Sequence, residues 1–205
     1  MIGKVLLAAL LAGIAAGLVM GAIQHVRLTP RIVAAEAFEG AHGENAARTL
    51  STYATSAMAG AAFAAIMAGL SLLTGLAMTR ANGVIWGLCG FLAVTLAPAA
   101  GLPPELPGMP VGDLRASQIW WAGTIVATGF GIYLIAARAE LWAVAAAVIL
   151  IALPHVIGAP EASSQVSAVA PGLAAAFAAN AIAAGAVFWC LIGLFLGISM
   201  ERVAK

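Results

Sequence analysis

Long runs of apolar residues, separated by short polar stretches, make up most of the chain. Each run is near the roughly 17–25 residues that a helix needs to cross a bilayer. The six runs cover residues 4–26, 53–79, 84–101, 119–137, 141–157 and 172–199. The fifth run is the shortest and contains Pro154 near its end, so it could enter the membrane without crossing it. The pattern predicts an all-α polytopic membrane protein with a single domain over residues 1–205. The domain is a bundle of six transmembrane helices, or of five if the fifth run does not cross.

Composition supports a protein that lies mostly in lipid. The 205 residues are 63% hydrophobic and 8% charged, and the mean hydropathy is +1.07. A soluble domain has about 25% charged residues, so this chain cannot cover a water-facing surface. The net charge of +1 and the lack of a basic patch exclude nucleic-acid binding. Cys89 and Cys190 both lie inside apolar runs and are interpreted as packing residues.

The sequence lacks the motifs of the common catalytic classes. It has no G-x-x-x-x-G-K-[ST] loop, so it does not hydrolyse nucleotides by that motif. It also has no H-E-x-x-H, no G-x-S-x-G and no catalytic Ser or Cys paired with His. We therefore predict that the chain is not an enzyme and that any concentrative transport depends on an ion gradient or a partner.

Glycine recurs at a spacing of four in three of the apolar runs. This spacing puts the glycines on one helix face, where another backbone can approach closely. The three sets are Gly13, Gly17 and Gly21; Gly83 and Gly87; and Gly193 and Gly197. The first run is interpreted as a retained helix, because its apolar core is longer than that of a signal peptide and no small-x-small cleavage site follows.

Basic residues favour one orientation only slightly. Alternate threading puts five of the nine on the face of the two termini and four on the other. The short loops at Arg80 and Arg138 belong to the first face, so the positive-inside rule favours two cytoplasmic termini. After the first run, Thr29 and Pro30 are typical of a helix cap and first residue, and Gly40 of a helix end, which predicts a short surface helix.

The same threading collects the chemistry-bearing residues on the face opposite the termini. That face has all three histidines and six of the eight acids, whichever way the protein sits. Its members are His25, Glu36, Glu39, His42, Glu44, Glu105, Asp113, Arg115, His155 and Glu161. The result depends on an even number of spans.

Four of these residues are candidate ligands for a divalent cation: His25, His155, Glu105 and Glu161. Imidazole and carboxylate bind first-row divalent cations, and a cation pathway needs negative charge at its mouth. Prolines on both sides of Glu105 restrict where its carboxylate can reach. A histidine at a membrane interface can also be a simple amphipathic anchor, so that interpretation stays open.

Two amides are candidate pathway residues, Gln24 beside His25 and Asn180 in the last run. Asn180 lies roughly 12 Å down its helix, where an amide either lines a path or bonds across helices. His42 lies between glycines and is interpreted as a solvated loop residue.

These segments together resemble CbtA, a family of proposed cobalt transporter subunits. The segments that carry the resemblance are LLAALLAGIAAGLVMGAIQHVRLTP, AEAFE, LPPELPG, Arg115 with Trp120 and Trp121, and PHVIGAPE. The resemblance implies a bacterial inner-membrane protein of five or six helices that moves cobalt for cobalamin synthesis. It also implies a small single-span partner subunit with a histidine-rich tail. The metal would be a transported cation, with no permanently bound cofactor.

Two other classes remain open. One is an accessory or structural membrane subunit that binds no metal, in which loop composition alone explains the acidic face. The other is a membrane enzyme, against which the missing motifs argue. Imidazole and carboxylate do not separate cobalt from nickel or zinc, because they bind all three.

Overall fold

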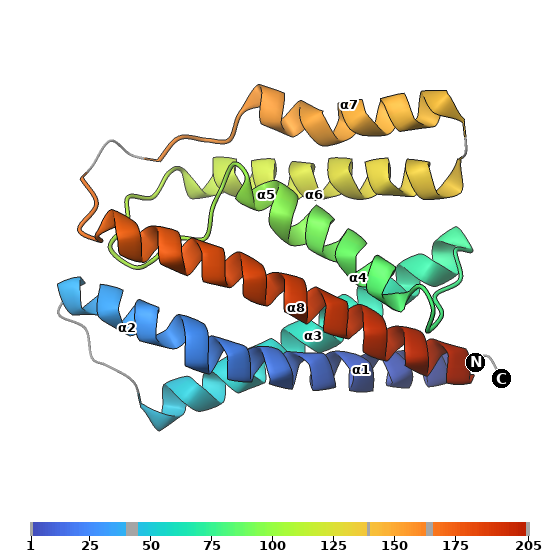
Figure 1. Ribbon diagram of the computed structural model, residues 1–205, viewed down its shortest axis with the longest axis horizontal. Coiled ribbons are helices and arrows are strands. Elements are labelled where there is room, and N and C mark those ends of the chain that lie inside the picture. The colour runs from blue at the N-terminus through green and yellow to red at the C-terminus, as the bar shows by residue number, and fades with distance from the viewer. Residues whose placement is uncertain (1, 40–44, 139, 163–165, 204–205) are drawn as a thin grey trace. The chain divides into compact units, whose positions relative to one another are not determined.

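The computed structural model describes residues 2–39, 45–138, 140–162 and 166–203 (Figure 1). Every regular element in these ranges is a helix, which confirms the all-α prediction. Four of the described helices are long and apolar enough to cross a bilayer, and two shorter ones are apolar; six spans remain a prediction. The four long ones are Ile2–Glu36, Ala46–Thr74, Leu114–Ala137 and Pro171–Val203, and the shorter ones are Gly83–Ala99 and Leu141–Ile157.

The chain forms two compact units. Unit 1 consists of residues 1–88 and 183–205, and unit 2 consists of residues 89–182. Two helices, one beginning at Gly83 and the other at Pro171, each contribute residues to both units. Each unit is therefore described by its own contacts.

The first helix is longer than the sequence predicted. Its successive parts are α1 (Ile2–Ile23), the π-helix η1 (Gln24–Leu28), α2 (Thr29–Glu36) and the 3-10 helix η2 (Ala37–Glu39). The prediction that Thr29 caps a separate helix is wrong: Leu28 and Thr29 both have right-handed helical backbone angles, and no side chain caps the start of α2. The proposed end at Gly40 lies outside the described residues.

Both π-helices come just before a proline, and the proline ring explains why they form. In η1 the Thr29 N–H bonds the Gln24 carbonyl, and Pro30 follows. In η3 (Leu92–Leu96) the Ala97 N–H bonds the Leu92 carbonyl, and Pro98 follows. A proline ring clashes with the carbonyl four residues earlier in a regular α-helix. The wider π turn makes room for the ring, so each helix continues past its proline.

The remaining helices have ends that the local sequence explains. Their bounds are α3 (Ala46–Thr74), α4 (Gly83–Phe91), α5 (Ala97–Ala99), α6 (Leu114–Ala137), α7 (Leu141–Ile157) and α8 (Pro171–Val203). Asn45 caps α3 through a 2.9 Å hydrogen bond from the Arg48 N–H, and Gly75, at φ 70°, ends it. Helix α3 thus begins seven residues before the predicted run and ends five residues before its end. Asp113 caps α6 by accepting a 2.7 Å hydrogen bond from the Ala116 N–H.

Backbone contact between glycines joins the helices of unit 1. A Cβ atom on Gly13 of α1 would overlap the backbone of Gly60 in α3, and one on Gly17 would overlap Ser56. In the same unit, a Cβ on Gly83 of α4 would overlap Gly193 of α8. The predicted glycine faces are therefore packing surfaces, and two of them pack against each other.

We expect Gly13→Ala to destabilise the protein and Gly3→Ala to leave it as stable or more so. Both residues lie on α1, but a Cβ on Gly13 would overlap the Gly60 backbone, whereas a Cβ on Gly3 has nothing within 4 Å. Overpacking at Gly13 should cost about 1–3 kcal/mol. Thermal unfolding in detergent measures both variants, and equal midpoints would contradict the α1–α3 contact.

Candidate functional site

The end of α7 carries the histidine of the segment PHVIGAPE. Pro154 has no N–H, and its carbonyl accepts 3.0 Å hydrogen bonds from the Trp120 indole and the Gly158 N–H. Gly158, at φ 90°, then takes the chain out of the helix. Trp120 therefore fixes the last turn of α7 against the first turns of α6.

The His155 ring lies between two backbone carbonyls. Its Nε2 is 3.0 Å from the Ala97 oxygen at α5, and its Nδ1 is 3.0 Å from the Ile151 oxygen one turn earlier in α7. The Trp120 ring meets it edge to face at 5.8 Å. A neutral imidazole has one N–H, so it donates to only one of these oxygens, whereas an imidazolium donates to both.

The loop of Glu105 runs along the segment that follows α7. A Cβ on Gly101 would come 2.9 Å from the Ala159 Cβ, and one on Gly112 would come 2.8 Å from the Glu161 carbonyl. These approaches put Glu105 and Glu161 on adjoining segments of unit 2. Both acids are exposed, while Leu106, the neighbour of Glu105, is 3% exposed and anchors the loop.

Unit 1 contains the other predicted histidine. His25 and Gln24 open the π-helix η1, and both are half-buried. The predicted end of the first run at residue 26, beside His25, is wrong, because the helix continues to Glu39. The buried Ser56 hydroxyl of α3 donates a 3.0 Å hydrogen bond to the Gln24 side-chain oxygen. Gln24 therefore joins η1 to α3 beside His25.

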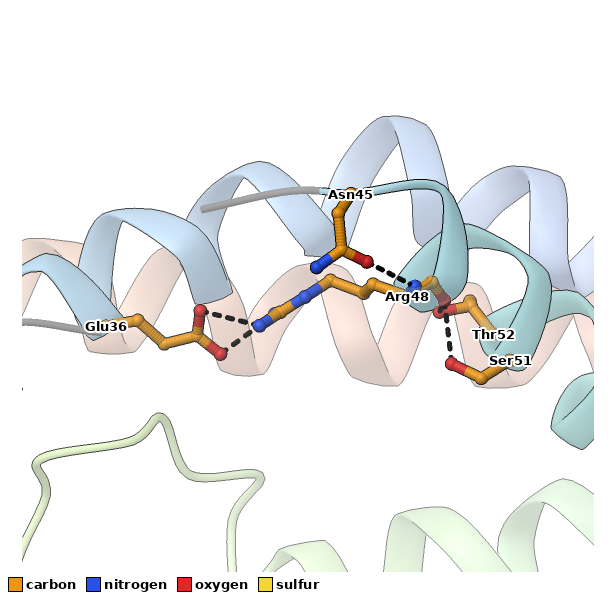
Figure 2. A network of polar contacts seen from close by, with 5 residues as sticks. All are labelled: Glu36, Asn45, Arg48, Ser51 and Thr52. Carbon is orange, nitrogen blue, oxygen red and sulfur yellow. Dashed lines mark hydrogen bonds and ion pairs between the residues drawn. The ribbon is translucent and has the colours of Figure 1, made fainter. Parts of the chain in front are cut away.

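Two acids of the predicted face have structural partners instead. Glu36 of α2 accepts two hydrogen bonds, at 2.8 and 2.9 Å, from the Arg48 guanidinium of α3 (Figure 2). Asp113 is the cap of α6. No local pattern indicates the Glu36–Arg48 pair, because the two residues are 12 apart across a loop. The Arg48 guanidinium therefore compensates the charge of Glu36 within unit 1.

Asn180 of α8 makes a local contact. Its amide donates a 2.7 Å hydrogen bond to the Ala176 carbonyl, one turn earlier in the same helix. His42 and Glu44 lie outside the described residues. Within either unit, the described residues contain no group of three or more His, Cys, Asp or Glu side chains that could hold a metal ion.

A comparison with models of known protein families tests the resemblance to CbtA that the motifs indicated. The family model described as "Probable cobalt transporter subunit (CbtA)" matches residues 2–201. The chain belongs to the CbtA family. No curated protein and no solved structure matches it.

Membership in the CbtA family confirms the resemblance that was drawn from the sequence. It makes the chain a subunit of a probable cobalt transporter, which implies partner subunits. The apolar helices add that it is a multi-pass membrane protein with lipid around it. The CbtA match, over residues 2–201, includes residues of both units.

We expect Trp120→Phe to lower stability more than Trp121→Phe. The first change removes the indole donor to Pro154 while keeping an aromatic ring, whereas Trp121 is 44% exposed. Loss of one hydrogen bond costs about 0.5–1.5 kcal/mol. The measurement is thermal unfolding in detergent. Equal effects of the two changes would mean that the Trp120 indole does not hold α7.

Proposed function

We propose that this CbtA chain moves a divalent cation, cobalt, across the bacterial inner membrane. In this proposal His25, His155, Glu105 and Glu161 capture the ion at the face opposite the two cytoplasmic termini. Gln24 and Asn180 are pathway residues. The family assignment supports cobalt as the cargo.

The observation that carries the proposal is the convergence at the end of α7. There, Trp120 and Ala97 contact His155, and the adjoining loops present two exposed carboxylates. Exposed carboxylates attract a cation, and imidazole is a good ligand for cobalt. An imidazole and two exposed carboxylates on neighbouring segments of unit 2 support this proposal.

Capture at His155 would be reversible for a structural reason. A metal needs the lone pair of a ring nitrogen, but both nitrogens lie 3.0 Å from carbonyl oxygens. Binding must therefore break one of these contacts, which weakens the net affinity. A transport site requires this weakness, because it must release its ion.

The partner in this proposal is a small single-span subunit with a histidine-rich tail. The second candidate function is an accessory membrane subunit that binds no metal. The structural roles of Glu36 and Asp113 favour it, because they explain part of the acidic face without any ion. A cobalt-dependent rise in the unfolding midpoint of the purified chain would separate the two.

Reporter fusions test the topology. We expect fusions at residues 45, 110 and 165 to report the same, external side, because α7 crosses the membrane in a six-span arrangement. The basic short loops favour two cytoplasmic termini. A cytoplasmic signal at residue 165 alone would mean that α7 does not cross, and His155 would then not share a membrane face with His25.

Uptake of cobalt by cells that express the chain with its partner tests the capture residues. We expect His25→Ala and His155→Ala each to reduce uptake at least tenfold with normal membrane insertion. If both histidines bind one ion, the double variant should be little worse than either single variant. Glu105→Gln and Glu161→Gln should raise the cobalt concentration for half-maximal uptake several-fold.

The matched control is His42→Ala, a change of the third histidine, which the sequence places in a glycine-flanked loop. It should leave uptake unchanged. Wild-type uptake in both His25→Ala and His155→Ala would overturn the capture proposal and favour the accessory role.

A further inference from the structure

The loop between α5 and α6 contains a tight turn directly after Glu105. The Met109 N–H donates a 3.2 Å hydrogen bond to the Leu106 carbonyl, and Gly108 has φ 81°. Proline at the second position and glycine with a positive φ at the third are typical of a type II turn, and Pro107 and Gly108 occupy these positions. The backbone of residues 106–109 is therefore set by its own sequence.

The sulfur atom of Met109 closes the same turn with a second hydrogen bond. It accepts the Leu106 N–H at a distance of 3.2 Å, so Leu106 and Met109 bond each other in both directions. A thioether sulfur is a weak acceptor, and a methionine side chain has three rotatable bonds that must be fixed to keep it in place. The neighbouring backbone helps, because the Gly108 carbonyl accepts a 3.4 Å hydrogen bond from the Ala168 N–H, just before α8.

This second hydrogen bond acts on the backbone of Glu105. The Leu106 N–H lies in the same planar peptide unit as the Glu105 carbonyl, so holding the N–H orients that unit. Prolines restrict the rest of the segment, because each ring sets its own φ and limits the residue before it. From residue 102 to residue 107, Glu105 alone is neither a proline nor followed by one. Its backbone is therefore the part of the segment that the sulfur contact holds.

A thioether is also an acceptor that can be changed chemically in place. A peroxide oxidises it: a sulfur lone pair forms an S–O bond, the O–O bond breaks, and the peroxide is reduced to water. With the sulfur 3.2 Å from the Leu106 nitrogen, an added oxygen does not fit between them. The side chain must then move away from the N–H. Met109 lies in a loop and is partly exposed, so a peroxide can reach it.

We propose that Met109 is a positioning residue that holds the Glu105 carboxylate through its sulfur atom, and that oxidation of this sulfur to the sulfoxide releases the Glu105 loop. Methionine sulfoxide reductases restore the thioether, so the release is reversible. The effect on cobalt capture rests on the proposed function. The hydrogen bond to the sulfur can be measured without any transport.

Amide hydrogen exchange of the purified chain, followed by mass spectrometry, tests the sulfur contact. Between residues 103 and 107 only Glu105 and Leu106 have an N–H, so a peptide from this segment reports on the contact with little background. Met109→Leu keeps an apolar side chain but removes the acceptor, so the Leu106 N–H should exchange about five- to tenfold faster. Peroxide treatment of the wild-type chain should have the same effect, and a sulfoxide reductase should reverse it.

Two further variants are matched controls for this measurement. Met109→Asn puts the Oδ1 atom as many bonds from Cα as the methionine sulfur is, so it should restore slow exchange. Met200→Leu makes the same change as Met109→Leu at another partly exposed methionine, in α8, and should leave the exchange of Leu106 unchanged.

Cobalt uptake by cells that express the chain with its partner tests the effect on Glu105. Met109→Leu should raise the cobalt concentration for half-maximal uptake several-fold and leave the maximal rate unchanged. Adding Met109→Leu to Glu105→Gln should change nothing further, because Met109 acts through that carboxylate. Met109→Asn should take up cobalt like the wild-type chain.

The outcomes separate this inference from the function on which it rests. Equal exchange of the Leu106 N–H in the wild-type chain and in Met109→Leu, or no effect of peroxide on it, overturns the sulfur contact. Additive effects of Met109→Leu and Glu105→Gln on uptake overturn the positioning role. Absence of cobalt uptake by the wild-type chain overturns the proposed function and any role of Met109 in capture, whereas the exchange measurement still decides whether the sulfur holds the turn.

Discussion

A chain in hydrocarbon must satisfy its backbone N–H and C=O groups from within the protein, and this constraint governs where its helices change course. Each proline in a helix removes one donor. Before Pro30 and before Pro98 the helix forms a π turn, and it then continues past the proline. Helix α7 ends three residues after Pro154, at Ile157. There the Pro154 carbonyl accepts a hydrogen bond from the Trp120 indole, and His155 contacts the Ala97 carbonyl. The candidate site is thus also the place where two helix ends are satisfied.

The lipid bilayer also determines how the helices pack against one another. Lipid is as apolar as leucine, so apolar side chains provide little force between helices, and close backbone approach replaces it. Gly13 against Gly60, and Gly83 against Gly193, provide that approach in unit 1. In α1 this packing face leads directly into η1, where Gln24 bonds Ser56 beside His25. The position of His25 therefore depends on the glycine contacts that precede it.

Four acidic residues of the predicted face divide into two groups by what they contact. Glu36 is paired with Arg48, and Asp113 caps α6, so both stabilise the fold. Glu105 and Glu161 are exposed on adjoining segments near the end of α7. The proposed function needs only this second group.

The sequence by itself determined the helical class, the apolar helices, the glycine packing faces and the family. These properties depend on local periodicity and on motifs, which need no knowledge of distant contacts. The tertiary structure decided that the first helix continues past Thr29, that Glu36 pairs with Arg48, and that the His155 ring contacts the Ala97 carbonyl, 58 residues away. The pairings bring together residues from separate helices. These contacts depend on the path of the loops between the helices and on how closely the helix backbones pack. A local pattern of apolar residues contains no information on either.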